Sequence, residues 1–278
     1  MNQKYKATGI ILKGSPLKES DRLVTVLTSE YGLIRAVAPG AKKHKSRLRG
    51  RTELFVVNEL LIVKGRSLDK IIQADTLYTY PGLSRDLGKL ACAQYLAELC
   101  LSLALSEQSQ TELYELFNEH LRRLEQLERY QSVYPFLAHG VFHLLAIAGI
   151  APEVFVCCQS RQALVPNLTH GQWRVGFSFD SGGIVDLSQE ESVSRGENAI
   201  GYFPKINYKL NNIELAILQL LNRRSLPSVE LEIGNPTATL SLDTAWMRVE
   251  KILREYVQHH IGKAIHSASL VDNLYVEF

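Results

Sequence analysis

The sequence predicts an α+β protein of several domains, in which a small β-barrel precedes a helical domain that carries an irregular insertion. Three observations predict this class. Strand-like runs fill residues 1–80, helical periodicity begins after residue 80, and a stretch rich in Gly and Pro interrupts the helices at 150–209. We therefore expect domains at 1–80, at 81–149 together with 210–278, and at 150–209.

Five strands are expected in the first domain, because runs rich in Val, Ile, Leu, Thr and Tyr alternate with turns that contain Gly, Ser or Pro. The runs are Ala7–Lys13, Arg22–Thr28, Leu33–Pro39, Leu54–Lys64 and Leu68–Tyr78. This number of strands in so short a segment is typical of a small closed barrel. Barrels of this kind commonly bind single-stranded nucleic acid on one face.

Helices are expected in the second domain from the spacing of its apolar residues. Their predicted ranges are 84–105, 111–127, 131–149, 213–224 and a long helix that begins near residue 241. The third of these is apolar almost all round, so it should form the buried centre of a bundle, and Gly149 should end it. Asn211 and Asn212 can cap the fourth helix.

The overall composition is that of an ordinary globular protein, with 46% hydrophobic and 22% charged residues among 278. No apolar run approaches the ~18 residues that a membrane-spanning helix needs, and the apolar run near the N-terminus is too short for a signal peptide. We therefore expect a cytoplasmic protein. The four cysteines form no C-x-x-C pair, so we expect no disulfide framework.

The densest charge lies in residues 42–51, which we call the basic loop. Six of its ten residues are basic and none is acidic: Lys42, Lys43, Lys45, Arg47, Arg49 and Arg51. Residues 1–80 carry a net charge of +8, whereas the rest of the chain carries −6. A phosphate backbone is the natural partner for such a domain, because each bound Lys or Arg releases a condensed counterion.

Other residues of the first domain support nucleic-acid binding, among them Arg35, Arg66, Tyr5 and Tyr31. If about six phosphates are neutralised, log K should fall against log salt with a slope of about −4 to −5. A solvated charge run is the alternative interpretation of the basic loop.

Catalytic motifs are not found. The sequence has no P-loop and no G-x-S-x-G, and His139 and His143 lack the glutamate that follows the first histidine in zinc peptidases. We therefore expect a binding protein, not an enzyme, with core or partly buried histidines.

The sequence leaves two other classes of function open. The first is a metal-dependent nuclease or nucleotide-processing enzyme that uses Asp180, Asp186 and Glu190 or Glu191. The second is an adaptor that binds protein partners only.

The order of several motifs resembles the RecO family of bacterial recombination mediators. The motifs are Glu19-Ser20-Asp21, Gly32, Gly40, the basic loop, Leu144–Gly149 with Pro152, Gly182-Gly183, and Tyr256–Gly262 with Ser267. The resemblance implies an OB-fold domain that binds single- and double-stranded DNA and anneals complementary strands. It also implies cooperation with RecR, with the single-strand-binding protein SSB and, indirectly, with the RecA recombinase.

The chain departs from the family in one respect. Many members carry a four-cysteine zinc site, and the matching positions here are Cys157, Ser160, Asp186 and Gln189. One thiolate and one carboxylate are inadequate for a structural zinc ion. We therefore expect residues 150–209 to be a metal-free, degenerate zinc-ribbon-like segment, held by residues such as Phe155, Trp173, Phe177 and Phe179, and we expect no cofactor. An acidic SSB tail would need a pocket rimmed by arginines, for which Arg122, Arg123 and Arg129 are candidates.

Overall fold

The structure, a computed structural model, describes residues 3–188, 203–226 and 239–273. They pack as two compact units. Unit 1 comprises Met1–Val133 and Ile265–Phe278, and unit 2 comprises Tyr134–Ala264. This grouping differs from the expected boundaries at residues 80, 149 and 209, which stay a prediction. Among the described helices, none combines the length and the hydrophobicity that a membrane-spanning segment requires.

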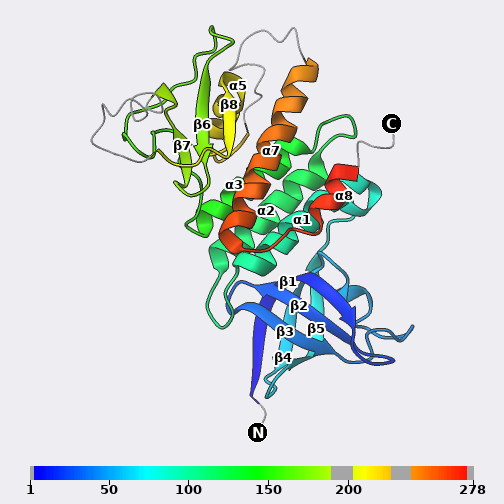
Figure 1. Ribbon diagram of the computed structural model, residues 1–278. Coiled ribbons are helices and arrows are strands. Elements are labelled where there is room, and N and C mark those ends of the chain that lie inside the picture. The colour runs from blue at the N-terminus through cyan, green and yellow to red at the C-terminus, as the bar shows by residue number, and fades with distance from the viewer. Residues whose placement is uncertain (1–2, 189–202, 227–238, 274–278) are drawn as a thin grey trace. The chain divides into compact units, whose positions relative to one another are not determined.

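Unit 1 begins with the predicted five-stranded barrel (Figure 1). Its strands are β1 (Lys4–Pro16), β2 (Arg22–Thr28), β3 (Gly32–Ala38), β4 (Val57–Val63) and β5 (Asp69–Tyr78). They close in the order β1-β2-β3-β5-β4, and β4 pairs with β1. This is the connectivity of an OB-fold, so the predicted barrel is confirmed, and the helices that follow it confirm the α+β class.

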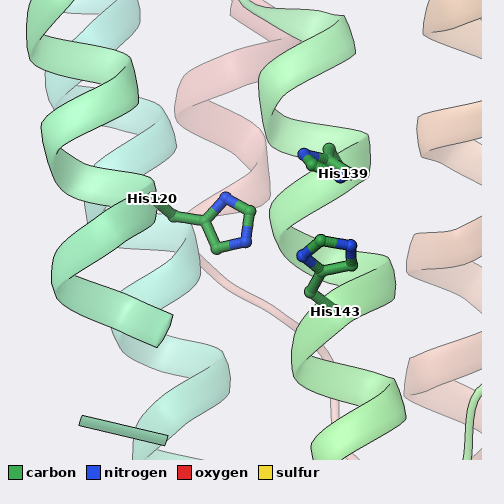
Figure 2. Close-up of side chains that lie close together, drawn as sticks. All are labelled: His120, His139 and His143. Atoms are coloured by element: carbon green, nitrogen blue, oxygen red, sulfur yellow. The ribbon is translucent and has the colours of Figure 1, made fainter. Parts of the chain in front are cut away.

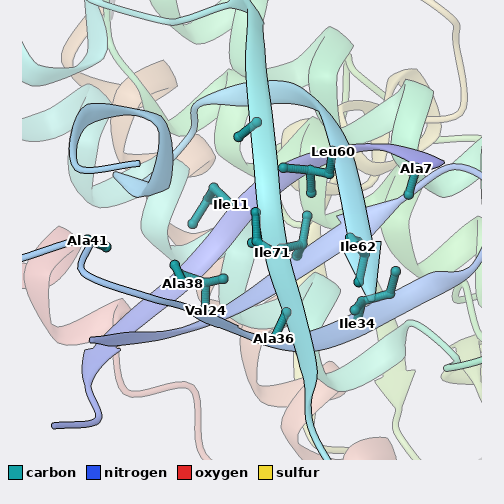
Figure 3. Packing of buried hydrophobic residues seen from close by; sticks show 12 residues of the cluster. Ala7, Ile11, Val24, Ile34, Ala36, Ala38, Ala41, Leu60, Ile62 and Ile71 are labelled. Atoms are coloured by element: carbon teal, nitrogen blue, oxygen red, sulfur yellow. The ribbon is translucent and has the colours of Figure 1, made fainter. Parts of the chain in front are cut away.

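The barrel is filled by small and β-branched side chains, which point inward from alternate positions of each strand (Figure 3). Ile11, Val24, Ala36, Leu60 and Ile71 are each less than 2% exposed. Closure is completed by a short parallel contact, in which Ala36 and Val37 of β3 pair with Asp69 and Lys70 of β5. The other four strand contacts are antiparallel and longer.

The described part of unit 1 also contains the 3₁₀ helices η1 (Gly50–Thr52) and η2 (Leu83–Arg85) and the helices α1 (Leu87–Leu103), α2 (Thr111–Gln126) and the short α8 (Ala268–Asp272). Asp86 caps α1 by accepting the backbone N–H of Lys89 at 3.0 Å. The buried ammonium of Lys89 donates to the carbonyl oxygens of Glu125 and Leu127. These carbonyls lie at the end of α2, where the helix itself leaves them unpaired.

The last described segment of unit 1 is fastened to α1 by Glu98. The carboxylate of Glu98 accepts the N–H groups of His266 and Ser267 at 2.9 and 2.8 Å, and the Ser267 hydroxyl at 2.5 Å. Burial raises the pKa of Glu98, but these hydrogen bonds outweigh it and hold the pKa below its ordinary value. The sequence did not predict this contact or α8.

Unit 2 combines helices with a small sheet. Its described elements are α3 (Tyr134–Ile147), β6 (Arg174–Ser178), β7 (Gly183–Val185), β8 (Tyr208–Asn211), α5 (Asn212–Leu220) and α7 (Thr239–Ile261). Helices α3 and α7 run side by side (Figure 1), and β6 pairs with both β7 and β8. As predicted, α3 is largely buried, and Gly149 terminates it at φ +73°.

The cap of α5 was also predicted correctly. The Asn211 side chain accepts the N–H of Glu214 at 2.9 Å, and the Glu214 carboxylate accepts the N–H of Asn211 at 2.9 Å. Phe177 and Phe179 of the small sheet are buried and contact Tyr256 of α7. Phe155 was wrongly expected to hold this segment, because its side chain is 44% exposed.

Gly32 occupies a position that no other residue can fill without strain. It has φ +64°, and a Cβ atom there would lie 2.0 Å from the carbonyl oxygen of Leu105. We predict that Gly32→Ala lowers the free energy of unfolding by more than about 1 kcal/mol. Gly50→Ala, where a Cβ meets nothing within 4 Å, is the matched control. Urea denaturation of both variants measures the effect, and equal midpoints would contradict it.

We also predict that Glu98→Gln lowers the free energy of unfolding by about 1–3 kcal/mol at neutral pH, because hydrogen bonds to a charged acceptor are lost. Since the folded-state pKa is depressed, wild type should lose this advantage as the pH falls through that pKa. Glu115→Gln, at an exposed position of α2, is the control. Thermal unfolding followed by circular dichroism across pH 3–7 tests this, and a pH-independent difference would argue against the ionised carboxylate.

Candidate nucleic-acid interface

The basic loop connects β3 to β4, and its first residues are held by the turn that joins β1 to β2. Asp21 accepts the backbone N–H of Gly40 at 2.8 Å, and the N–H of Lys42 donates to the carbonyl oxygen of Ser20 at 2.9 Å. The hydrogen bond from Gly40 is the main reason that the pKa of Asp21 lies below its ordinary value, and Lys18 and Lys43 add to it. Asp21 therefore stays ionised and fixes the start of the loop.

The body of the loop is a succession of tight turns. The N–H of Ser46 donates to the carbonyl oxygen of Lys43, that of Arg49 to Ser46, and that of Thr52 to Leu48. Leu48 packs against the hydrophobic core of the barrel. The loop therefore has internal order and an apolar anchor, although most of its side chains are exposed.

Arg51 differs from the other basic residues of the loop, because its guanidinium is turned back onto the barrel. It donates to the carbonyl oxygen of Ala74 and lies 3.4 Å from the Asp75 carboxylate. Its own carbonyl oxygen accepts the Asn58 amide at 2.8 Å. Arg51 thus anchors the end of the loop to β5, whereas a direct contact with DNA stays a prediction.

The remaining five basic residues of the loop share one environment: all are exposed and, among the residues that the structure describes, none has a carboxylate within 4.0 Å. They are Lys42, Lys43, Lys45, Arg47 and Arg49. Five cations on a short, fastened loop repel one another, and Asp21 near Lys43 offsets only a part of this repulsion. An anionic polymer would relieve it.

Arg35 and Arg66 lie away from the basic loop. Arg35 projects from the outer face of β3, and Arg66 lies in the turn between β4 and β5, residues 64–68. Both are exposed, and the described part of the chain pairs neither with an acid. In barrels of this topology the face formed by β2 and β3, together with the β1–β2 and β4–β5 turns, binds oligonucleotides. Arg35, Arg66 and the basic loop border this face.

Sequence reasoning did not identify the anchors of the loop. Asp21 lies 19 residues from Gly40, and Asp75 lies 24 residues from Arg51. No local pattern marks such pairs, because they meet only after the strands have paired. The motif Glu19-Ser20-Asp21 is a point of family resemblance, but the sequence alone does not show its physical role.

The residues at the positions of the zinc cysteines lie together, but they do not suit a zinc ion. Cys157 Sγ accepts the N–H groups of Ser160 at 3.5 Å and Asp186 at 3.3 Å. Burial raises the pKa of the Cys157 thiol, and these hydrogen bonds lower it by more. Asp186 also accepts the N–H of Ser188 at 2.9 Å. Only one of these three residues offers a thiolate, and Gln189 lies outside the described residues.

The carboxylates considered for a nuclease are not gathered into a metal site within the described residues. Asp180 lies 3.2 Å from His259, and Asp186 belongs to the turn around Cys157. Neither forms part of a group of three possible ligands in the described ranges. Glu190 and Glu191 lie outside those ranges.

His139 and His143 project from α3 one turn apart, and their ring centroids lie 3.9 Å from each other (Figure 2). The Nε2 atoms lie 2.8 and 3.1 Å from the carbonyl oxygen of Arg223. His139 is fully buried and His143 is partly buried, as the sequence predicted. His120, the third side chain drawn, is a buried residue of α2 in unit 1.

Two of the three arginines proposed as a rim for an SSB tail already form ion pairs within α2. Arg122 and Arg123 lie 2.7 and 3.0 Å from the carboxylate of Glu119, one turn earlier on α2. Exposed pairs of this kind contribute about 0.3–0.5 kcal/mol to a helix. Their binding role stays a prediction, as does that of Arg129.

Two family models match the chain. The model described as Recombination protein O N terminal matches residues 1–80, and the model described as Recombination protein O C terminal matches residues 84–269. A DNA repair protein RecO from Gloeothece citriformis is 60% identical over 278 residues, which cover 99% of this chain and 98% of that protein.

Further relatives are DNA repair proteins of the same name. A DNA repair protein RecO from a Nostoc species is 50% identical over 99% of this chain and 97% of its own length. Another, from Trichodesmium erythraeum, is 50% identical over 98% of this chain and 95% of its own length. The chain therefore belongs to the RecO family of DNA repair proteins.

Proposed function

We propose that the protein binds single- and double-stranded DNA without catalysing a reaction on it, and that it anneals complementary strands. The observation that carries this proposal is the set of five exposed cations, none of which forms an ion pair within the described part of the chain, on a loop fastened at both ends. A loop whose backbone is already ordered loses little conformational entropy when phosphates bind.

The proposed mechanism is electrostatic. Lys42, Lys43, Lys45, Arg47 and Arg49 hold phosphates of two strands together, which screens the repulsion between the strands and lets bases pair without ATP. Contacts with phosphates carry no sequence information, so the same loop can act on any complementary pair.

Family membership supports the further proposal that this binding serves recombinational repair in the cytoplasm. There the protein would help to exchange SSB for RecA together with RecR. The net charge of −6 after residue 80 suits contacts with protein partners, whereas the charge of +8 before it suits DNA.

The test compares DNA binding by wild type and by a variant with Gln at Lys42, Lys43, Lys45 and Arg47. We predict that the slope of log K against log salt for single strands becomes less steep by about 3, because four phosphate contacts are lost. Annealing of two oligonucleotides, one pre-coated with SSB, should slow in parallel. Fluorescence anisotropy and a strand-pairing assay without ATP or added metal measure both quantities.

The matched control replaces four exposed lysines of unit 2 with Gln: Lys205, Lys209, Lys251 and Lys263. It changes the net charge by the same amount without altering the loop. Equal effects of the two variants would show that the loop has no special role. Magnesium-dependent cleavage of the oligonucleotide would favour the nuclease, and no affinity at low salt would favour the adaptor.

A further inference from the structure

The mouth of the barrel contains a cavity of about 480 Å³, at the end of β3 opposite the basic loop. It is lined by β1, by the first half of β3, by the β4–β5 turn and by residues 106 and 107. Its size lies within the range of pockets that hold small organic ligands. All of its lining residues belong to unit 1.

The opening follows from the way in which the barrel closes. Strand β3 pairs with β5 only at Ala36 and Val37 in the described structure, and at its start the N–H of Leu33 donates to the carbonyl oxygen of Leu105 at 3.0 Å. Between these contacts no described strand covers the free edge of β3 at Ile34 and Arg35. This uncovered edge of β3 leaves the cavity open at one end of the barrel.

Two tyrosines stand at this opening. Tyr31 is 39% exposed, and its ring lies edge-to-face against Tyr5, with the ring centroids 4.9 Å apart. The backbone N–H of Tyr31 donates to the Thr28 hydroxyl at 3.2 Å, and its carbonyl oxygen accepts the N–H of Glu107 at 3.0 Å. Tyr31 is therefore an exposed aromatic surface whose position is already fixed.

The charges of the cavity are arranged by depth. At the rim, Arg35 and Arg66 are exposed and form no ion pair in the described structure. Lys64, also at the rim, forms an ion pair with Glu107 at 3.2 Å. At the floor, the Asp69 carboxylate is 8% exposed and accepts the Tyr5 hydroxyl and the N–H of Gly65. A suitable ligand therefore has an anionic part outside and a neutral, hydrogen-bond-donating part inside.

We propose that this cavity holds one unstacked nucleotide of single-stranded DNA. The base stacks on Tyr31 and presents its N–H groups toward Asp69, while its phosphates lie on Arg35 and Arg66. The inference rests on the proposed DNA binding and adds a specific consequence. A duplex keeps its bases stacked inside and cannot fill the cavity, so the cavity confers a preference for single strands that the basic loop does not.

An acidic peptide fits less well. Its carboxylates could meet the arginines, but any acidic group that entered the cavity would face the buried Asp69 carboxylate. A nucleobase carries no charge and donates N–H groups, so the floor favours it.

The experiment compares an oligo(dT) with an abasic oligonucleotide of the same length, which keeps every phosphate and lacks the bases. Wild type should bind oligo(dT) more tightly, and Tyr31→Leu should weaken that binding by about fivefold to 150-fold, the range for one stacked base. Binding of the abasic strand and of duplex should stay unchanged. Tyr31→Phe should keep the preference, and Tyr130→Ala, at an 87% exposed tyrosine, is the matched surface control.

A second measurement uses the wild-type protein, so its result does not depend on whether the Tyr31→Leu variant folds. Photo-crosslinking with 5-iodouracil in the oligonucleotide should give a labelled peptide that contains Tyr31. Crosslinks confined to other peptides, or a Tyr31→Leu variant that is folded and keeps the preference, would overturn the inference while leaving the proposed DNA binding intact. Protection of Tyr31 by an acidic peptide but not by oligo(dT) would overturn it too. No binding of any DNA by wild type would instead overturn the proposed function.

Discussion

The pairing of β5 with its two neighbours, β4 and β3, is the constraint on which the candidate interface depends. The antiparallel pairing with β4 sets Ala74 and Asp75 opposite Leu60 and Glu59, where Arg51 at the end of the basic loop can reach them. The parallel pairing with β3 closes the barrel with only two residue pairs, at Ala36 and Val37. Because this contact is so short, Ile34 and Arg35 have no described partner strand on that side, and the cavity opens beside Arg35. The two pairings of β5 therefore account for the anchored loop and for the open cavity.

Anchoring matters because the basic loop is electrostatically unfavourable in isolation. Five like charges within eight residues would favour an expanded chain, and ordering it costs about 1–2 kcal/mol of backbone entropy per residue. Asp21 at the start, Leu48 in the middle and Arg51 at the end offset this cost with a charged hydrogen bond, an apolar contact and an ion pair. Of the six basic residues, the structure thus uses one to hold the other five in place.

Much of the fold could be predicted from the sequence, because periodicity and turn residues are local signals. The strand Arg22–Thr28 was predicted to the residue, and the cap of α5 at Asn211 is one of the two candidates, Asn211 and Asn212. Contacts between distant residues were not predicted, such as Glu98 with Ser267, because no spacing rule relates them. In the candidate site, the basic residues of the basic loop could be predicted because they lie close together in the sequence. Their division into an anchoring arginine and five exposed side chains, and the meeting of Tyr5, Tyr31 and Asp69, required the folded barrel.

The basic loop and the cavity beside Tyr31 would contribute different properties to annealing. Phosphate contacts at the basic loop attract any nucleic acid, including the duplex product, so a protein that relied on them alone would remain on what it had made. A cavity that takes an unstacked base binds only the substrate of the reaction. When two strands pair, their bases withdraw into the duplex and the contact with Tyr31 is lost, while the phosphates remain available. Pairing itself would then weaken binding, which favours release of the duplex and return of the protein to single strands.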